Sequence, residues 1–69
     1  MLVTINGKIH NFKTSLSLEA LLKEFGIDHS KVAIERNLEI VPKSTYDQII
    51  INDGDKLEIV YFIGGGALS

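Results

Sequence analysis

The chain has 69 residues, contains no cysteine and carries a formal net charge of −2. A chain of this length supports one core, and the absence of cysteine excludes disulfides, thiolate metal sites and cysteine nucleophiles. Acidic and basic residues are interspersed, so we expect no basic patch that binds nucleic acid. No apolar run approaches the roughly 20 residues of a membrane-spanning helix, and no secretory leader is evident. We therefore expect one cytoplasmic domain with neither nucleic acid nor membrane as a partner.

The first third of the chain combines a hairpin pattern with a helix pattern. β-forming residues flank Asn6-Gly7, a dipeptide that favours the positive φ angles of a tight turn. After Ser17, the expected N-cap, leucines and a phenylalanine recur with the period of an amphipathic helix, and Gly26 suits the left-handed position after its end. The expected elements are strands over residues 2–5 and 9–13 and a helix over residues 18–25.

The rest of the chain carries short β-forming segments separated by turn residues. Pro42 ends one of them because proline cannot donate to a strand ladder. The sequence Asp53-Gly54-Asp55 predicts a tight turn before a last strand that is rich in β-branched and aromatic residues. The expected elements are strands over residues 32–36, 39–41 and 56–63, with a short apolar segment over residues 49–51.

This order of elements predicts two layers, because one amphipathic helix must bury its apolar stripe against one face of a sheet. We therefore predict an α+β fold of the β-grasp (ubiquitin-like) type. Its mixed sheet has four to five strands, one main helix crosses one face, and the last strand lies beside the first. We expect residues 1–63 to form the domain and residues 64–69 to form a flexible glycine tail with a three-residue extension.

Three glycines, Gly64, Gly65 and Gly66, directly follow the last predicted strand. A phosphate-binding loop is excluded, because neither a helix nor a Gly-Lys-Ser/Thr sequence follows them. A frayed terminus is the plainer interpretation. The alternative is a reactive tail, since glycine lets a partner protein close around the backbone. Three extended glycines span about 10 Å, enough to enter the active site of another enzyme.

The chain shows no catalytic group of its own. His10 and His29 stand alone, with no cysteine, no serine and acid grouping and no metal-ligand spacing beside them. We expect both histidines at the surface and assign neither a role. A carrier whose tail reacts in another enzyme needs no catalytic group.

Alternation along the last strand predicts a docking surface next to the tail. Leu57, Ile59 and Tyr61 share one face of that strand, and Val60 and Phe62 share the other face with a glutamate. If the glutamate marks the solvent side, Val60 and Phe62 are apolar side chains held in water, as expected where a tail-modifying enzyme docks. The alternative is that Phe62 folds back over the edge of the sheet.

Motifs in one order along the chain make it resemble the thiamine sulfur-carrier (ThiS) family. They are residues 40–44 (IVPKS), Tyr46, the turn at residues 53–55 and the last strand with its glycines over residues 56–66. The Asn6-Gly7 turn and the amphipathic helix fit the same family. Each motif is weak alone, since the Asp-Gly-Asp turn is usually structural, but together they are specific.

The resemblance implies a sulfur carrier that is not an enzyme. In the family, a ThiF-type adenylating enzyme uses ATP to activate the terminal glycine, and sulfur that a cysteine desulfurase system supplies converts it to a thiocarboxylate. The thiocarboxylate then donates sulfur at thiazole synthase. Gly66 matches the terminal glycine, and Gly64 and Gly65 match the tail. No bound cofactor and no metal site are implied.

Two features leave alternatives open. Ala67, Leu68 and Ser69 follow Gly66, so its carbonyl belongs to an amide, which cannot be adenylated like a carboxylate. Either a processing protease removes these residues, which we favour, or they were added to the expressed protein, or the chain is a divergent member without carrier function. The same tail would also serve a molybdopterin-synthase small subunit or a carrier for tRNA thiolation, and a non-catalytic β-grasp interaction module would not use it.

Overall fold

The computed structural model describes residues 1–62. The predicted tail, residues 64–69, lies outside the described residues, and so does Ile63, the last residue of the predicted domain. The strands are β1 (Leu2–Ile5), β2 (Lys8–Asn11), β3 (Leu16–Ser17), β4 (Val32–Arg36), β5 (Glu39–Ile40), β6 (Ile50–Ile51) and β7 (Lys56–Tyr61). The helix is α1 (Leu18–Glu24), and two 3₁₀ turns are η1 (His29–Lys31) and η2 (Lys43–Thr45).

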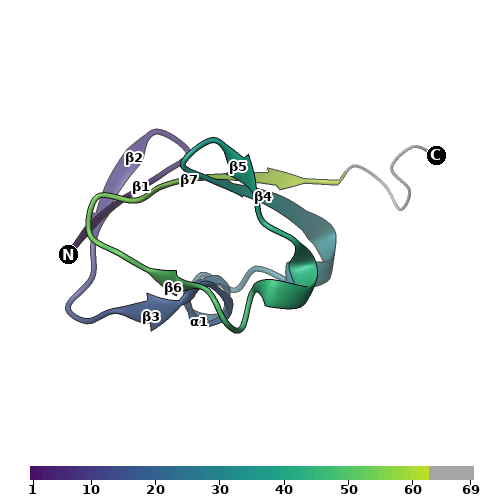
Figure 1. The fold of residues 1–69 in the computed structure, drawn as a ribbon, viewed down its shortest axis with the longest axis horizontal. Helices are drawn as coiled ribbons and strands as arrows, with labels where there is room; N and C mark the ends of the chain where they lie inside the picture. The colour runs from purple at the N-terminus through teal and green to yellow at the C-terminus, as the bar shows by residue number, and fades with distance from the viewer. Residues whose placement is uncertain (63–69) are drawn as a thin grey trace.

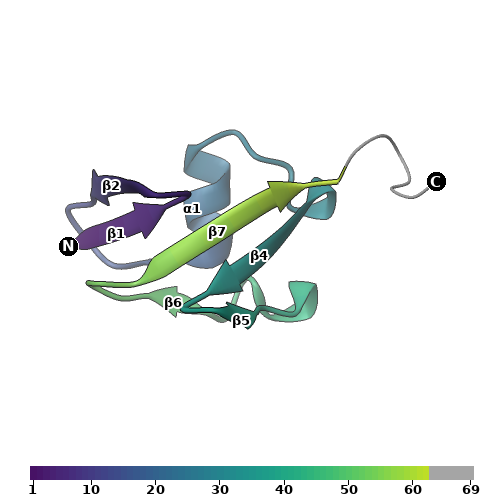
Figure 2. The ribbon, with the colours of Figure 1, turned by 90° about the horizontal axis from the view of Figure 1, so that it is seen from above.

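Five of these strands form one mixed sheet in the order β2-β1-β7-β4-β5. The last strand, β7, runs parallel to β1 on one side and antiparallel to β4 on the other. Helix α1 lies across one face of this sheet, together with the small pair β3-β6 (Figures 1 and 2). The prediction that the last strand lies beside the first is therefore confirmed. The predicted mixed sheet of four to five strands with one main helix is also confirmed, with five strands.

The Asn6-Gly7 turn links three strands. Both residues have positive φ, 50° and 82°, as the tight hairpin between β1 and β2 requires. The Asn6 side chain also reaches β7: its Oδ1 accepts from the Ile59 N–H at 2.7 Å, and its Nδ2 donates to the Ile59 carbonyl at 3.1 Å. A side-chain amide thus extends the parallel pairing beyond the end of β1.

Helix α1 begins and ends at the predicted signals. The Ser17 hydroxyl accepts from the Ala20 N–H at 3.1 Å, which makes Ser17 the N-cap. Gly26 adopts a φ of 70° after the C-cap Phe25, so the helix ends one residue before the predicted Phe25. The prediction missed β3, which pairs with β6 over only two residues on each strand, too few for alternation to reveal.

The core lies between the sheet and the α1 layer. The helix contributes Leu18, Leu21 and Leu22, which are all fully buried. The other apolar core residues come from the strands, from the residues directly after β2 and β5, and from the C-cap of η2: Val3, Ile5, Phe12, Val32, Ile34, Val41, Tyr46, Ile51, Leu57 and Ile59. The helix stripe and the inner faces of β1, β4 and β7 therefore form one core.

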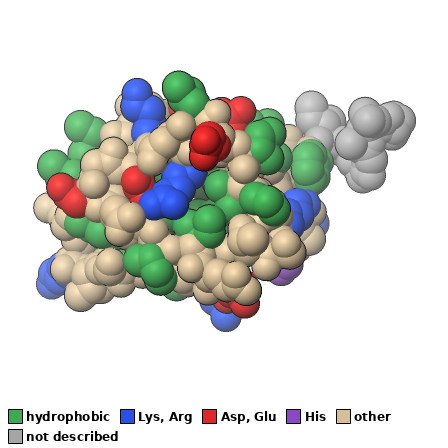
Figure 3. Space-filling model, in the orientation of Figure 1, with side chains coloured by type: hydrophobic (Ala, Val, Ile, Leu, Met, Phe, Trp, Pro, Cys, Tyr) green, Lys and Arg blue, Asp and Glu red, His purple; other side chains and the backbone are tan. Residues whose placement is uncertain are grey.

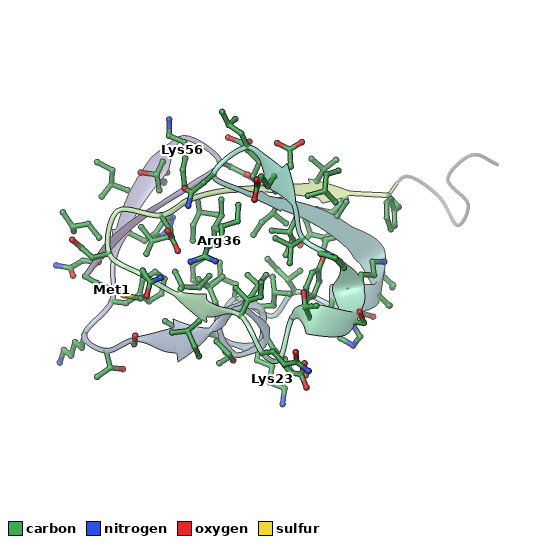
Figure 4. The ribbon with its side chains drawn as sticks, viewed as in Figure 1. Met1, Lys23, Arg36 and Lys56 are labelled. Carbon is green, nitrogen blue, oxygen red and sulfur yellow. The ribbon has the colours of Figure 1, made fainter. Side chains whose placement is uncertain are left out.

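One buried carboxylate, Asp55, ties the start of β7 to the rest of the fold. It accepts from the Arg36 Nε at 3.0 Å, the Asn37 Nδ2 at 3.1 Å and the Asn52 N–H at 2.8 Å. Figure 4 shows Arg36 between the sheet and β6. Burial raises the pKa of Asp55, but hydrogen bonds from Asn52, Asn37 and Arg36 outweigh it and hold the pKa below its ordinary value of 3.8. The Asp-Gly-Asp turn therefore has a structural role.

Candidate functional site

The end of β7 presents exposed apolar side chains. Val60 is 60% exposed and Phe62 46%, whereas Leu57 and Ile59 are buried. The predicted exposure of Val60 and Phe62 is therefore confirmed. Tyr61 alternates with the buried pair but is 55% exposed. The end of β7 extends beyond helix α1 (Figure 2).

Phe62 continues from β7 and is held at two points, its backbone N–H and its ring. Its N–H donates to the Lys31 carbonyl at 2.9 Å. The Lys43 Nζ lies 4.6 Å from the centre of the Phe62 ring and donates to the Ser30 carbonyl at 3.1 Å. Phe62 thus rests against the η1 and η2 segments while about half of it remains exposed. The two sequence interpretations of Phe62, exposed in water or folded over the edge, each describe part of its surface.

The η2 turn that carries Lys43 is anchored in the core. Tyr46 is buried, its N–H donates to the Lys43 carbonyl at 3.2 Å, and its own carbonyl accepts from the Glu19 N–H at 3.0 Å. Burial raises the pKa of the Tyr46 hydroxyl, an effect that the backbone of Ile34 offsets only in part. Within residues 1–62, that hydroxyl finds no hydrogen-bond partner of good geometry. Lys43 therefore projects from a fixed turn.

The outer face of the sheet extends the apolar surface. On this face, Val60 lies opposite Ala33, and Glu58 lies opposite Glu35, which in turn lies opposite Ile40. Ile40 is 72% exposed. Sequence reasoning missed Ala33 and Ile40, because the place of Ala33 beside Val60 and of Ile40 on the same face two strands away depends on the pairing of β4 with β5 and β7. Figure 3 shows hydrophobic side chains at the end of the molecule where β7 ends.

The structure places neither histidine in a reactive grouping. His10 is half-buried, with its ring 5.3 Å from that of Phe25 and 6.4 Å from that of Phe12, and His29 is exposed in η1. Among residues 1–62, no three His, Cys, Asp or Glu side chains are grouped so that they could hold a metal ion. Over the same residues, no helix is long and apolar enough to cross a membrane. The predicted tail residues Gly64, Gly65 and Gly66 lie outside the described part of the chain.

The sequence profile of the ThiS family matches residues 3–66, nearly the whole chain. The chain belongs to the ThiS family. The sulfur carrier protein ThiS of Bacillus subtilis is 35% identical over its entire length, which covers 94% of this chain. A crystal structure of the thiamine biosynthesis protein ThiS from Geobacter metallireducens superposes with a TM-score of 0.83 at 33% identity, covering 96% of this chain and all of that one. These ThiS structures confirm the β-grasp fold.

Two longer proteins also contain a segment similar to this ThiS-family chain. A thiazole synthase of Paramagnetospirillum magneticum is 64% identical over 97% of the chain, and one of Magnetococcus marinus is 41% identical over 96%. The chain spans only about a fifth of their lengths, 21% and 20%. In both relatives, a ThiS-like segment is therefore part of the same polypeptide as a much larger remainder.

Proposed function

We propose that the protein is a sulfur carrier of thiamine biosynthesis whose working group is the acyl carbon of Gly66. The observation that carries the proposal is the family match, which extends from Val3 through the glycine run and ends at residue 66. The geometry supports it, since β7 leads out of the fold beside the exposed side chains of Val60 and Phe62. The protein is then a co-substrate of other enzymes and not an enzyme itself.

The chemistry needs an accessible carboxylate at the end of the glycine run. A Gly66 carboxylate oxygen attacks the α-phosphorus of ATP, pyrophosphate leaves, and an acyl adenylate forms. Sulfide then attacks the acyl carbon, AMP leaves, and loss of a proton gives the thiocarboxylate. A persulfide donor would instead form an acyl disulfide with loss of AMP, and a thiol reductant would cleave its S–S bond to release the thiocarboxylate. Gly64 and Gly65 suit this chemistry because the absence of side chains lets a narrow channel close around the backbone.

The proposal assigns the chain a set of protein partners. An adenylating enzyme of the ThiF type would dock on the surface of Val60 and Phe62, and a cysteine desulfurase system would supply the sulfur. Thiazole synthase would receive the sulfur, an assignment supported by the two thiazole synthases that contain a similar segment. We place these reactions in the cytoplasm.

The residues after Gly66 add a processing step to the proposal. With Ala67 attached, the Gly66 carbonyl is an amide, and the amide nitrogen must leave before a carboxylate exists. We propose that a protease hydrolyses the bond between Gly66 and Ala67 and releases the residues that follow Gly66. The family match ends at the same residue, which supports this position for the cut.

The test uses a form of the protein that ends at Gly66. It is incubated with the adenylating enzyme, ATP and sulfide, and its intact mass is measured. We expect the mass to increase by the difference between sulfur and oxygen, and the increase to disappear without ATP. A form that binds the enzyme but never gains sulfur would support a passive β-grasp interaction module instead.

A further inference from the structure

Lys43 joins three segments at the point where β7 leaves the fold. It begins the η2 turn, its Nζ donates to the Ser30 carbonyl in η1 at 3.1 Å, and the same Nζ lies 4.6 Å from the centre of the Phe62 ring. Cations placed within about 6 Å of an aromatic ring centre are attracted to its face. One ammonium group therefore holds both η1 and the side chain of Phe62.

The backbone of Phe62 is held by the residue next to Ser30. The Phe62 N–H donates to the Lys31 carbonyl at 2.9 Å, so two consecutive residues of η1 provide both contacts. Phe62 is consequently fixed twice, through its N–H and through its ring. We call this arrangement of Ser30, Lys31, Lys43 and Phe62 the exit clamp.

We propose that Lys43 is a positioning residue for the chemistry at Gly66, because the exit clamp fixes the position of Phe62, from which the tail starts. This inference rests on the proposed function. Four residues lead from Phe62 to the acyl carbon of Gly66, about 13 Å of extended backbone, and three of them are glycines that add no side-chain anchor. Phe62 is therefore the last side-chain anchor before the glycines, and a shift in its position changes the distance that the tail must span to the enzyme's active site.

The contacts of the exit clamp set the loss of adenylation rate that we expect when Lys43 is changed. Reacting atoms tolerate little displacement, since about 1 Å can cost roughly a hundredfold in rate. The enzyme's channel restores part of the alignment, and the contact between Phe62 N–H and the Lys31 carbonyl remains when Lys43 is changed. We therefore expect a loss of about fivefold, near the upper contribution of one cation–aromatic contact at an exposed site.

The test compares variants of the form ending at Gly66, with two independent measurements. Lys43→Met keeps most of the side-chain length but removes the charge, Lys43→Arg keeps a cation that stacks on aromatic rings, and Phe62→Leu removes the ring. Lys23→Met is the matched control, because Lys23 projects from the helix layer away from the sheet (Figure 4). Amide hydrogen exchange at Phe62 reports the clamp in the free protein, and kcat and KM for adenylation report its consequence.

We expect Lys43→Met to speed exchange at the Phe62 amide and to lower kcat about fivefold, with KM within about twofold. Lys43→Arg should keep the exchange rate and kcat close to those of the unsubstituted form, and Lys23→Met should change neither the exchange rate nor kcat. In the Phe62→Leu background, Lys43→Met should have no further effect, because Lys43 acts through the ring.

Other outcomes overturn the inference. If Lys43→Met raises KM equally in the unsubstituted and the Phe62→Leu forms, the charge of Lys43 contacts the enzyme directly and does not act through Phe62. If exchange and kcat are both unchanged, the contact has no positioning role. If the unsubstituted form ending at Gly66 is not adenylated at all, the proposed function fails and the positioning role with it, and faster exchange in Lys43→Met would then show a purely structural clamp.

Discussion

The two ends of β7 differ in how they are held. At the start of the strand, Asp55 is buried and accepts three hydrogen bonds, and the side chain of Arg36 lies over it between the layers. At the other end, Val60 and Phe62 are exposed, and the contacts that hold Phe62 within residues 1–62 are those of the exit clamp. One strand thus combines a polar network that fixes the fold with an apolar end left open for partners.

The largest effect should come from the chain beyond the open end. We expect the form ending at Gly66 to exceed a form ending at Ser69 at least about a hundredfold in ATP-pyrophosphate exchange with the adenylating enzyme. In the longer form the free carboxylate is displaced from Gly66 by three residues or about 10 Å of extended backbone. Equal exchange rates in the two forms would show that Gly66 is the wrong residue.

The closed end should respond to a change at Asp55 through stability. Asp55→Asn replaces a carboxylate that accepts from three donors with an amide that cannot accept from all of them. We expect a loss of about 2 kcal/mol in the free energy of unfolding, measured with urea at neutral pH. Adenylation per folded molecule should not change, and a selective loss of adenylation would place Asp55 in the functional site.

Acid should weaken the same closed end. Because the folded-state pKa of Asp55 is lowered, its contribution to stability is present above about pH 3.8 and is lost as the pH falls through the folded-state pKa. In Asp55→Asn, the stability curve should therefore be flatter below about pH 4 than in the unsubstituted protein. Curves that stay parallel would show that other carboxylates dominate the acid response.

The open end should respond to a change at Phe62 through binding. We expect Phe62→Ala to weaken binding to the adenylating enzyme about tenfold, because a half-exposed aromatic side chain at a docking surface often contributes strongly. The free energy of unfolding should fall by only about 1–2 kcal/mol, since roughly half of that side chain is buried in the free protein. Ile9→Ala is the matched control, because Ile9 is 68% exposed on the distant strand β2. Equal losses in both variants would argue against a specific surface at Val60 and Phe62.

Sequence patterns predicted the parts of this comparison that depend on local chemistry. The Asn6-Gly7 turn, the Ser17 N-cap and the alternation of Leu57 and Ile59 with Val60 follow from backbone preferences and strand period, and the structure confirms them. The exit clamp was not predictable in this way. Lys43 and Phe62 are 19 residues apart in the sequence. They meet because the fold brings η1 and η2 to the end of β7.

The smallest effect should come from Tyr46, which anchors the turn beneath the open end. Its ring fills the core, while its hydroxyl is buried without a hydrogen bond of good geometry. Tyr46→Phe keeps the ring and removes the unpaired oxygen, so we expect the free energy of unfolding to stay equal or to rise by up to about 1 kcal/mol.

The folded-state pKa of Tyr46 is raised, so the unsubstituted protein should lose stability as the pH rises above about 10, where the unfolded chain ionises first. The variant should lack that part of the loss. Urea unfolding at neutral pH and at about pH 10.5 measures both effects. If Tyr46→Phe is destabilised by about 1 kcal/mol or more at neutral pH, the hydroxyl makes a stabilising hydrogen bond after all, and the open end is anchored by polar contacts as the closed end is.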